Sequence, residues 1–203
     1  MGVPPMSATA VPAVDYRAET ALPRTGKMPV PREVRTWKMA RGATFRVLGI
    51  DPGLNITGYA VVDFGRDGQT IVEAGTLRTT ARADMAERIQ QIYDDLRAVL
   101  SETQPDLAAI EQLYAHYAHP RTAIVMAHAR GAVMLACRQA SVKVQHLAAT
   151  RVKKSVTGNG HASKLQVARA IQQICHLRTL PSPPDVADAL AIALCAGRSA
   201  GRA

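Results

Sequence analysis

A short apolar run closed at once by turn residues is the strongest constraint that this chain places on its fold. Residues 47–50 read VLGI and lead directly into the turn sequence DPG at 51–53, the pattern of a buried strand that ends in a tight turn. Two further strands are predicted at 58–63 and 70–77, and the residues between them at 65–68 are rich in turn formers. Three consecutive antiparallel strands are therefore expected.

Helix and strand patterns alternate along the rest of the chain. Residues 84–100 carry their apolar side chains on one stripe, the spacing of an amphipathic helix. Residues 122–138 are small or apolar on nearly every face, which predicts a helix buried against more than one surface, and a second subunit could be one of these. The order indicates an α/β fold, a five-stranded mixed sheet with helices on both faces. The remaining predicted elements are strands at 107–110 and 142–146 and helices at 163–175 and 185–195.

The composition excludes several classes of protein. With 203 residues, 47% of them hydrophobic and 20% charged, the chain can bury a core and is not disordered throughout. No apolar run approaches the roughly 18 residues of a membrane-spanning helix. Cys137, Cys175 and Cys195 are far apart and unsuited to a disulfide framework or a zinc site, which favours a cytoplasmic location. The net charge of +9 points to a polyanionic partner.

Residues 1–45 differ in composition from the remainder. They hold six of the twelve prolines and show no sustained apolar periodicity, so we interpret them as a disordered extension or as the product of a mis-assigned start codon. Met39 lies just before the first predicted strand, and a chain that begins there is expected to keep its activity. The folded domain is predicted at 46–197, followed by a short C-terminal tail at 198–203.

The placement of the acidic residues is the most informative chemical feature. Residues 112–184 contain no Asp or Glu but ten Lys and Arg, which makes this half of the chain a basic surface suited to phosphates. Asp51 and Glu111 each follow an apolar run, and adjacent parallel strands would bring the two together. Asp185 and Asp188 share one face at the start of the last helix.

Four carboxylates that converge on one spot repel one another unless cations neutralise them. Oxygen ligands of this kind suit Mg²⁺. A carboxylate metal site on a basic protein suggests phosphodiester hydrolysis with two metal ions.

Each acid also has an ordinary structural explanation. Asp51 before Pro-Gly is a common turn residue. Asp185 lies three residues after Ser182, in a capping-box arrangement that also suits the helix dipole. Glu111 is harder to explain in this way, because a carboxylate that ends a buried strand is costly without a partner. The set of four is therefore more specific than any one member.

Taken together, the motifs of this chain resemble those of the RuvC crossover junction endodeoxyribonucleases, in order and over roughly residues 46–197. The resemblance implies a ribonuclease-H-like fold, a homodimer, and Mg²⁺-dependent symmetric nicking of four-way (Holliday) DNA junctions during recombination and repair. It also implies two Mg²⁺ ions per site, which Mn²⁺ could replace, and cooperation with the branch-migration complex RuvA-RuvB. The matching motifs are VLGIDPG at 47–53, TGY at 57–59, AIEQ at 109–112, ARG at 129–131, VTGNG at 156–160 leading to Lys164, and DVADALAIA at 185–193.

Position by position, the resemblance assigns roles to particular residues. The metal-binding carboxylates correspond to Asp51, Glu111, Asp185 and Asp188, and the two important basic positions correspond to Lys153 and Lys164. A lysine at such a site could stabilise transition-state charge or hold a DNA phosphate. Arg151 and Lys154 are further DNA-binding candidates, although a solvated helix face is the favoured explanation for Lys154.

An aromatic residue that stacks on bases opened at the crossover is another feature of this family. Tyr114 falls at this position, and Tyr117 is a nearby competitor. The neighbouring His116 and His119 are interpreted as loop surface, because His at a spacing of three residues is weak evidence for a metal site.

Two other classes of function compete with a junction nuclease. An actin-like ATPase or sugar kinase also begins with a strand followed by Asp and Gly, but it needs a second similar half that this chain has no room for. A non-catalytic DNA-binding module would explain the basic half. It leaves the acids unexplained, since carboxylates weaken phosphate binding unless metal lies between them.

Overall fold

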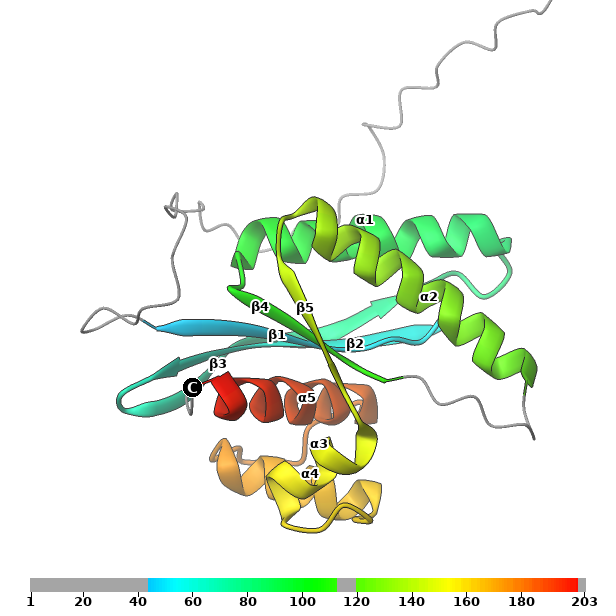
Figure 1. Ribbon diagram of the computed structural model, residues 1–203. Helices are drawn as coiled ribbons and strands as arrows, with labels where there is room; N and C mark the ends of the chain where they lie inside the picture. Colours follow the sequence, from blue (N-terminus) through cyan, green and yellow to red (C-terminus); the bar gives the residue numbers. More distant parts are fainter. Residues whose placement is uncertain (1–43, 113–119, 201–203) are drawn as a thin grey trace, which may run out of the picture. The chain divides into compact units, whose positions relative to one another are not determined.

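The computed structural model describes residues 44–112 and 120–200, and all ten helices and strands named below lie in these two ranges (Figure 1). The strands are β1 (Phe45–Asp51), β2 (Ile56–Gly65), β3 (Gly68–Arg78), β4 (Leu107–Glu111) and β5 (Lys143–Leu147). The helices are α1 (Met85–Thr103), α2 (Pro120–Gln139), α3 (Ala149–Thr157), α4 (Lys164–Ile174) and α5 (Pro184–Ala200).

The five strands form one mixed sheet in the order β3-β2-β1-β4-β5. β1, β2 and β3 pair antiparallel, whereas β4 runs parallel to both β1 and β5. The predicted α/β class and five-stranded mixed sheet are therefore confirmed. Because β1 and β4 are adjacent and parallel, their carboxyl ends meet at the same edge of the sheet.

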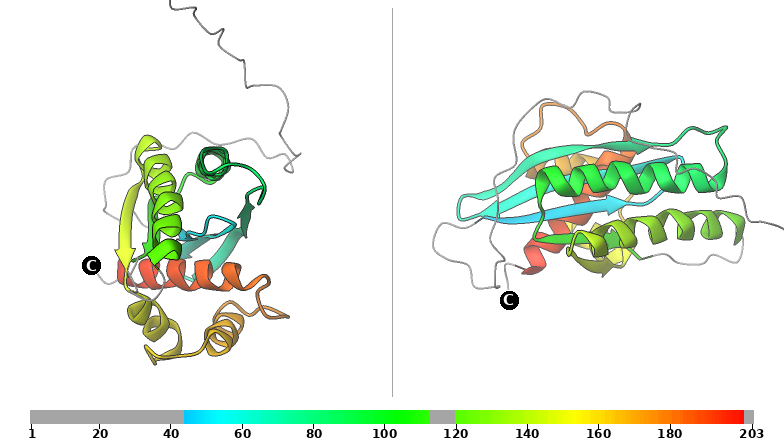
Figure 2. Two further views of the ribbon diagram at one scale, coloured as in Figure 1. Left: turned by 90° about the vertical axis from the view of Figure 1, so that its right-hand side faces the viewer. Right: turned by 90° about the horizontal axis from the view of Figure 1, so that it is seen from above.

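The helices cover the two faces of the sheet separately (Figures 1 and 2). α1 and α2 lie on one face, and α5 lies on the other with α3 and α4 outside it. Successive residues of β1 enter opposite cores, because Val47 packs with the α5 side and Leu48 packs with the α1 side. Burial on both faces explains why this strand is a continuous apolar run rather than an alternating one.

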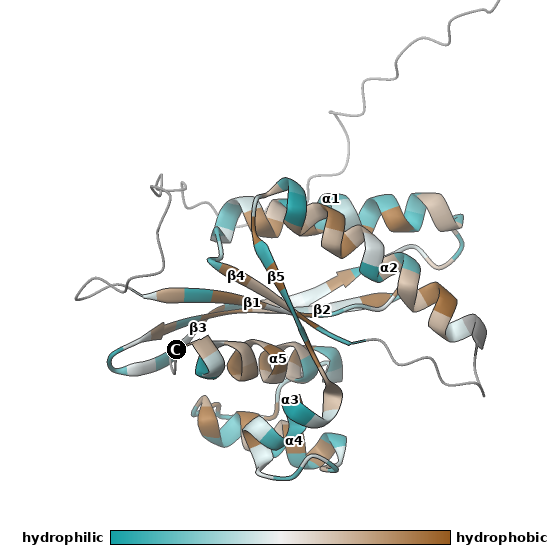
Figure 3. Cartoon of the chain, in the orientation of Figure 1, coloured by the Kyte–Doolittle hydropathy of each residue, from teal (hydrophilic) through white to brown (hydrophobic). Residues whose placement is uncertain are grey.

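Close contact between α5 and the sheet depends on a glycine in β1. A Cβ atom built at Gly49 would lie 2.2 Å from the carbonyl oxygen of Ala189 and 2.9 Å from Cβ of Ala193. The helix backbone therefore rests directly on the strand. α5 is buried without interruption from Ala189 to Gly197, between the sheet and the α3–α4 layer, and it is apolar over much of its length in Figure 3.

Three features of the fold differ from the sequence prediction. α3 was not predicted, because its N-cap Ala148 makes no side-chain capping hydrogen bond and so gives no start signal. α5 continues to Ala200, so residues 198–200 of the predicted tail are helical. α2 is buried along one stripe within this chain, and Ile124 and Leu135 are 57% and 52% exposed, so this chain does not itself supply the second burying surface that was predicted.

None of the helices within the two described ranges has the length and hydropathy that crossing a bilayer requires. Cys137, Cys175 and Cys195 are free thiols, and the first and last of these are buried.

Candidate metal centre and comparison with known proteins

Asp51 and Glu111 end two neighbouring strands at the same level of the sheet. The register of β1 and β4 pairs Ile50 with Ile110, so each carboxylate follows directly on a paired residue. Both acids are half-buried. The parallel pairing predicted from the two apolar runs thus brings these side chains to one edge.

α5 contributes Asp185 and Asp188 to the same edge. Asp51 pairs across the β1–β2 ladder with Gly58, and a Cβ atom at Gly58 would lie 2.2 Å from the carbonyl oxygen of Asp185. The absence of a side chain on Gly58 therefore lets the first turn of α5 lie against the start of β2. This contact sets both α5 acids beside the end of β1.

The electrostatics of Asp51 and Glu111 reflect this convergence. The pKa of Asp51 is raised to about 7, mainly by burial and then by the charges of Asp188, Glu111 and Asp185, against a lowering by Lys164. Burial also raises the pKa of Glu111, followed by the charge of Asp188. Both carboxylates resist ionisation unless positive charge is supplied nearby.

A hard divalent cation fits this donor set chemically. The candidate ligands are carboxylate oxygens, which Mg²⁺ and Mn²⁺ prefer, and the neutralisation they need is what such an ion provides. Within residues 44–112 and 120–200, no group of three or more Asp, Glu, His or Cys side chains stands arranged to hold a metal ion. The chemistry of the donors is therefore what supports a metal here.

Two lysines supply positive charge to the acids. Nζ of Lys164, at the start of α4, lies 3.0 Å from Oδ2 of Asp188. Lys153 on α3 is half-buried, and its charge and that of Lys164 lower the pKa of Glu111. Both lysines therefore lie near the carboxylates, Lys164 beside Asp188 and Lys153 within electrostatic reach of Glu111.

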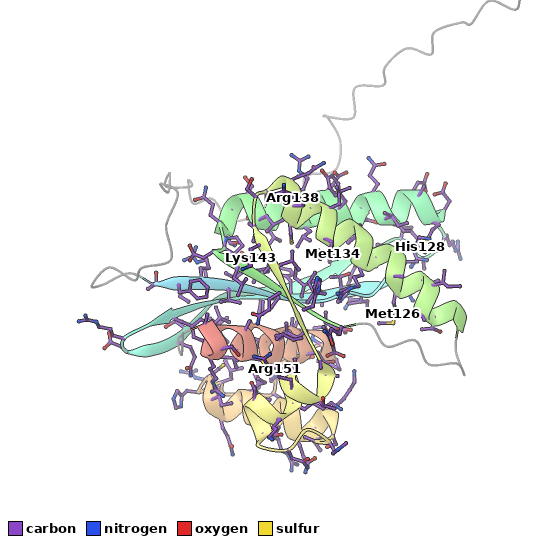
Figure 4. The ribbon with its side chains drawn as sticks, viewed as in Figure 1. Met126, His128, Met134, Arg138, Lys143 and Arg151 are labelled. Atoms are coloured by element: carbon purple, nitrogen blue, oxygen red, sulfur yellow. The ribbon has the colours of Figure 1, made fainter. Side chains whose placement is uncertain are left out.

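The other predicted basic residues lie further out. Lys154 is exposed on α3, which agrees with a solvated helix face. Arg151 is exposed as well, and its Nη2 donates a 3.0 Å hydrogen bond to Oγ of Ser199 in α5. Figure 4 labels Arg151 on α3, on the opposite face of the sheet from α2. Tyr114, Tyr117, His116 and His119 fall outside the described residues.

One supporting residue was not identified from the sequence. Thr57 is fully buried, and its hydroxyl donates a 2.8 Å hydrogen bond to the carbonyl of Gly53, whose N–H in turn lies 3.3 Å from the same hydroxyl. These bonds close the loop that follows Asp51. The only signal in the sequence was the place of Thr57 in the TGY motif, because threonine is common in strands and does not by itself indicate a buried hydrogen bond.

The model of the RuvC crossover junction endodeoxyribonuclease family matches residues 47–196. The chain belongs to this family. It is 47% identical over 156 residues to crossover junction endodeoxyribonuclease RuvC of Rhodopirellula baltica, covering 76% of this chain and 86% of that protein. It is 44% identical over 150 residues to RuvC of Halorhodospira halophila, covering 74% and 88% respectively.

Solved structures agree with this assignment. RuvC of Thermus thermophilus superposes with a TM-score of 0.72 at 32% identity, over 78% of this chain and 96% of that one. The yeast mitochondrial Holliday junction resolvase superposes with a TM-score of 0.57 at 15% identity, over 78% of this chain and 80% of that one, a likeness of fold alone. The ribonuclease-H-like fold implied by the motifs is confirmed. Membership of a nuclease family also decides against the kinase and the non-catalytic alternatives.

Proposed function

We propose that this RuvC family member is a crossover junction endodeoxyribonuclease that resolves four-way DNA junctions by paired symmetric nicks, with Mg²⁺ as its cofactor, in recombination and repair. One observation carries the proposal: the ends of β1 and β4 and the start of α5 bring Asp51, Glu111, Asp185 and Asp188 to one edge of the sheet, beside Lys153 and Lys164. The carboxylates provide the donors for divalent ions, and the lysines provide charge that matches a phosphate.

The four carboxylates would hold two Mg²⁺ ions, and Mn²⁺ has the same preference for oxygen ligands. When bound, such ions supply an activated water and stabilise the leaving oxygen of a phosphodiester. Asp51 must be ionised to serve as a ligand. Because the pKa of Asp51 is about 7 in the metal-free chain, a proton competes with the metal for this ligand near neutral pH when Mg²⁺ is limiting.

The lysines have a different part in this proposal. Lys153 and Lys164 lower the pKa of Glu111, and Lys164 also lowers that of Asp51. They thereby favour the ionised ligands. Either ammonium could also contact the scissile phosphate, because both lie near the carboxylates.

The substrate follows from the basic half of the chain and from the relatives. A solved structure of T. thermophilus RuvC in complex with a Holliday junction superposes on this chain with a TM-score of 0.72, at 32% identity, covering 77% of this chain and 94% of that one. The candidates for contacts with the junction phosphates are Arg151, Lys153, Lys154 and Lys164. The candidate for base stacking is Tyr114.

A homodimer is part of the proposal, because two symmetric nicks require two equivalent sites. The outer face of α2 is the candidate interface: Ile124, Met134 and Leu135 are 57%, 36% and 52% exposed on a single helix, and Figure 4 shows Met126 and Met134 along it. Exposed apolar residues grouped in this way are typical of interaction surfaces. Cooperation with RuvA-RuvB and a cytoplasmic location stay predictions.

The test is cleavage of a synthetic mobile four-way junction by the purified full chain, with and without Mg²⁺. Asp51→Asn is the inactive variant, and Asp67→Asn in the exposed β2–β3 turn is the matched control. Paired nicks that require Mg²⁺, persist in the control and vanish in Asp51→Asn, while junction binding remains, are expected. Binding without nicks under either Mg²⁺ or Mn²⁺ would contradict the proposal.

A further inference from the structure

Arg130 joins three segments of the chain behind the carboxylate edge. It belongs to α2 and is half-buried. Its Nη1 donates to the backbone carbonyl of Glu111, and its Nη2 lies 2.6 Å from Nδ1 of His146 in β5. Because a guanidinium has only donors, Nδ1 of His146 must be the acceptor, which leaves the imidazole proton on Nε2. A single side chain thus connects α2, the end of β4 and β5.

The carbonyl that Arg130 contacts belongs to the last residue of β4. On the β5 side, the N–H of Gln112 donates a 2.7 Å hydrogen bond to the carbonyl of Leu147. The main chain at Glu111 and Gln112 is therefore anchored twice, by the β4–β5 ladder and by the guanidinium. A main chain fixed in this way restricts the directions that the Glu111 carboxylate can take.

Arg130 acts on the main chain rather than on the carboxylate charge. The charges that shift the pKa of Glu111 are those of Asp188, Lys153 and Lys164. The guanidinium of Arg130 contacts a carbonyl and an imidazole, both neutral acceptors. This distinguishes Arg130 from the lysines, whose contribution is electrostatic.

We propose that Arg130 is a positioning residue for Glu111: together with His146 it fixes the end of β4 so that the Glu111 carboxylate faces Asp51. The inference rests on the proposed function, in which both acids bind the metal. It assigns a role to the arginine of the 129–131 motif, and it links the helix that carries the candidate dimer surface to the candidate metal centre.

The first experiment compares Arg130→Gln and Arg130→Lys with Arg66→Gln, a control in the exposed turn between β2 and β3 that also removes one positive charge. The readouts are the single-turnover nicking rate, the Mg²⁺ concentration for half-maximal rate, and junction affinity without divalent ions. Residues that orient metal ligands typically change metal affinity or activity by about 10- to 100-fold when they are replaced. We expect both Arg130 variants to need more Mg²⁺ and to nick more slowly, with unchanged junction affinity.

Arg130→Lys is informative because lysine keeps the charge but cannot reach two acceptors with a planar fork. A variant that matches the wild type in rate and in Mg²⁺ requirement would overturn the proposal. So would a loss confined to junction affinity, because that result would make Arg130 a phosphate contact.

If Arg130→Gln does not fold, a pair of His146 variants tests the same proposal. His146→Asn keeps an acceptor close to the position of Nδ1, whereas His146→Ala removes it. We expect His146→Asn to retain the Mg²⁺ requirement of the wild type and His146→Ala to raise it. Equal behaviour of the two variants would overturn the proposal. Failure of the proposed function is recognised separately, because the wild type itself would then produce no nicks, and the role of Arg130 would fall with it.

Discussion

Nζ of Lys164 lies 3.0 Å from Oδ2 of Asp188, although the two residues belong to different helices and are 24 positions apart in the chain. The lysine side chain is 78% exposed and that of the aspartate is 25% exposed. An ion pair this open contributes little to stability. Its consequence is chemical, because it holds an ammonium beside the acids that we propose as metal ligands, and this hydrogen bond raises the pKa of Lys164 itself.

Replacing Lys164 with Gln is expected to move the pH dependence of cleavage upward. The charge of Lys164 lowers the pKa of Asp51 and of Glu111, so its removal leaves both acids protonated to a higher pH. Metal ligands must be deprotonated. The nicking rate at limiting Mg²⁺, measured from about pH 6 to pH 9, should therefore rise at a higher pH in Lys164→Gln than in the wild type. An unchanged profile alongside a uniformly lower rate would show that Lys164 acts only on the DNA.

Replacing Asp51 with Asn is expected to stabilise the metal-free protein above neutral pH. The pKa of Asp51 is about 7 in the folded chain, against an ordinary value of 3.8, so the folded state binds this proton more tightly than the unfolded state. The free energy of unfolding therefore falls by at most about 4 kcal/mol as pH rises from about 4 to about 7. Above that range this residue changes it no further. Because Asn does not ionise, Asp51→Asn should not show this pH-dependent loss of stability.

Thermal unfolding with a chelator at about pH 8 and at about pH 4 measures this effect. The variant should melt above the wild type at the higher pH and close to it at the lower. Added Mg²⁺ should raise the melting temperature of the wild type more than that of the variant, because a ligand stabilises only the state that binds it. If the variant were less stable than the wild type at both pH values, the buried charge of Asp51 would not be destabilising the metal-free chain, and the prediction would be wrong.

Much of the fold could be predicted because the spacing of apolar residues along the sequence follows the period of a strand or of a helix. The VLGI run predicted a buried strand, and Val47 and Leu48 do lie in separate cores on its two faces. The convergence of Asp51 and Glu111 was expected on the condition that their strands are adjacent and parallel, and β1 and β4 meet that condition. These features depend on one element at a time, or on two neighbouring ones.

The features that could not be predicted depend on contacts between distant elements. Nothing in the sequence around Lys164 indicates its pairing with Asp188, because that pairing depends on how α4 packs on α5. The role of Gly58 as a contact point for α5 appears only when the helix rests on the strand. α3 was missed because its start lacks a capping side chain.

A methyl group at Gly58 is expected to impair cleavage more than stability. The Cβ atom of Gly58→Ala would lie 2.2 Å from the carbonyl oxygen of Asp185, so the start of α5 must move, and Asp185 and Asp188 move with it. Overpacking of this kind costs about 1–3 kcal/mol. In Gly65→Ala, the matched control near the far end of β2, the nearest atom is 3.6 Å away.

Nicking assays well below the melting temperature separate the two effects of Gly58→Ala. A fully folded variant with wild-type activity would show that the α5 acids tolerate displacement. The control should retain both its stability and its activity.

The ion pair at the other end of β1 should affect stability without affecting chemistry. Arg46 donates from Nε and Nη2 to the two carboxylate oxygens of Asp63 at 2.7 and 2.8 Å, and from Nη1 to the carbonyl of Thr103 at 2.8 Å. The side chains of Arg46 and Asp63 are only 20% and 18% exposed. Asp63→Asn leaves the guanidinium mostly buried with a weaker partner, although the charge of Asp106 remains nearby, and this should cost about 1–3 kcal/mol.

Arg46 is near the start of β1, whereas Asp51 is its last residue, so the carboxylate edge should keep its geometry in every folded molecule of Asp63→Asn. Urea unfolding should therefore show a lower midpoint for Asp63→Asn than for the exposed control Asp67→Asn. The nicking rate of Asp63→Asn under native conditions should equal that of the wild type. A lower rate in the folded variant would mean that the two ends of β1 are coupled, because a local loss of stability cannot by itself slow the chemistry at the opposite end of a strand.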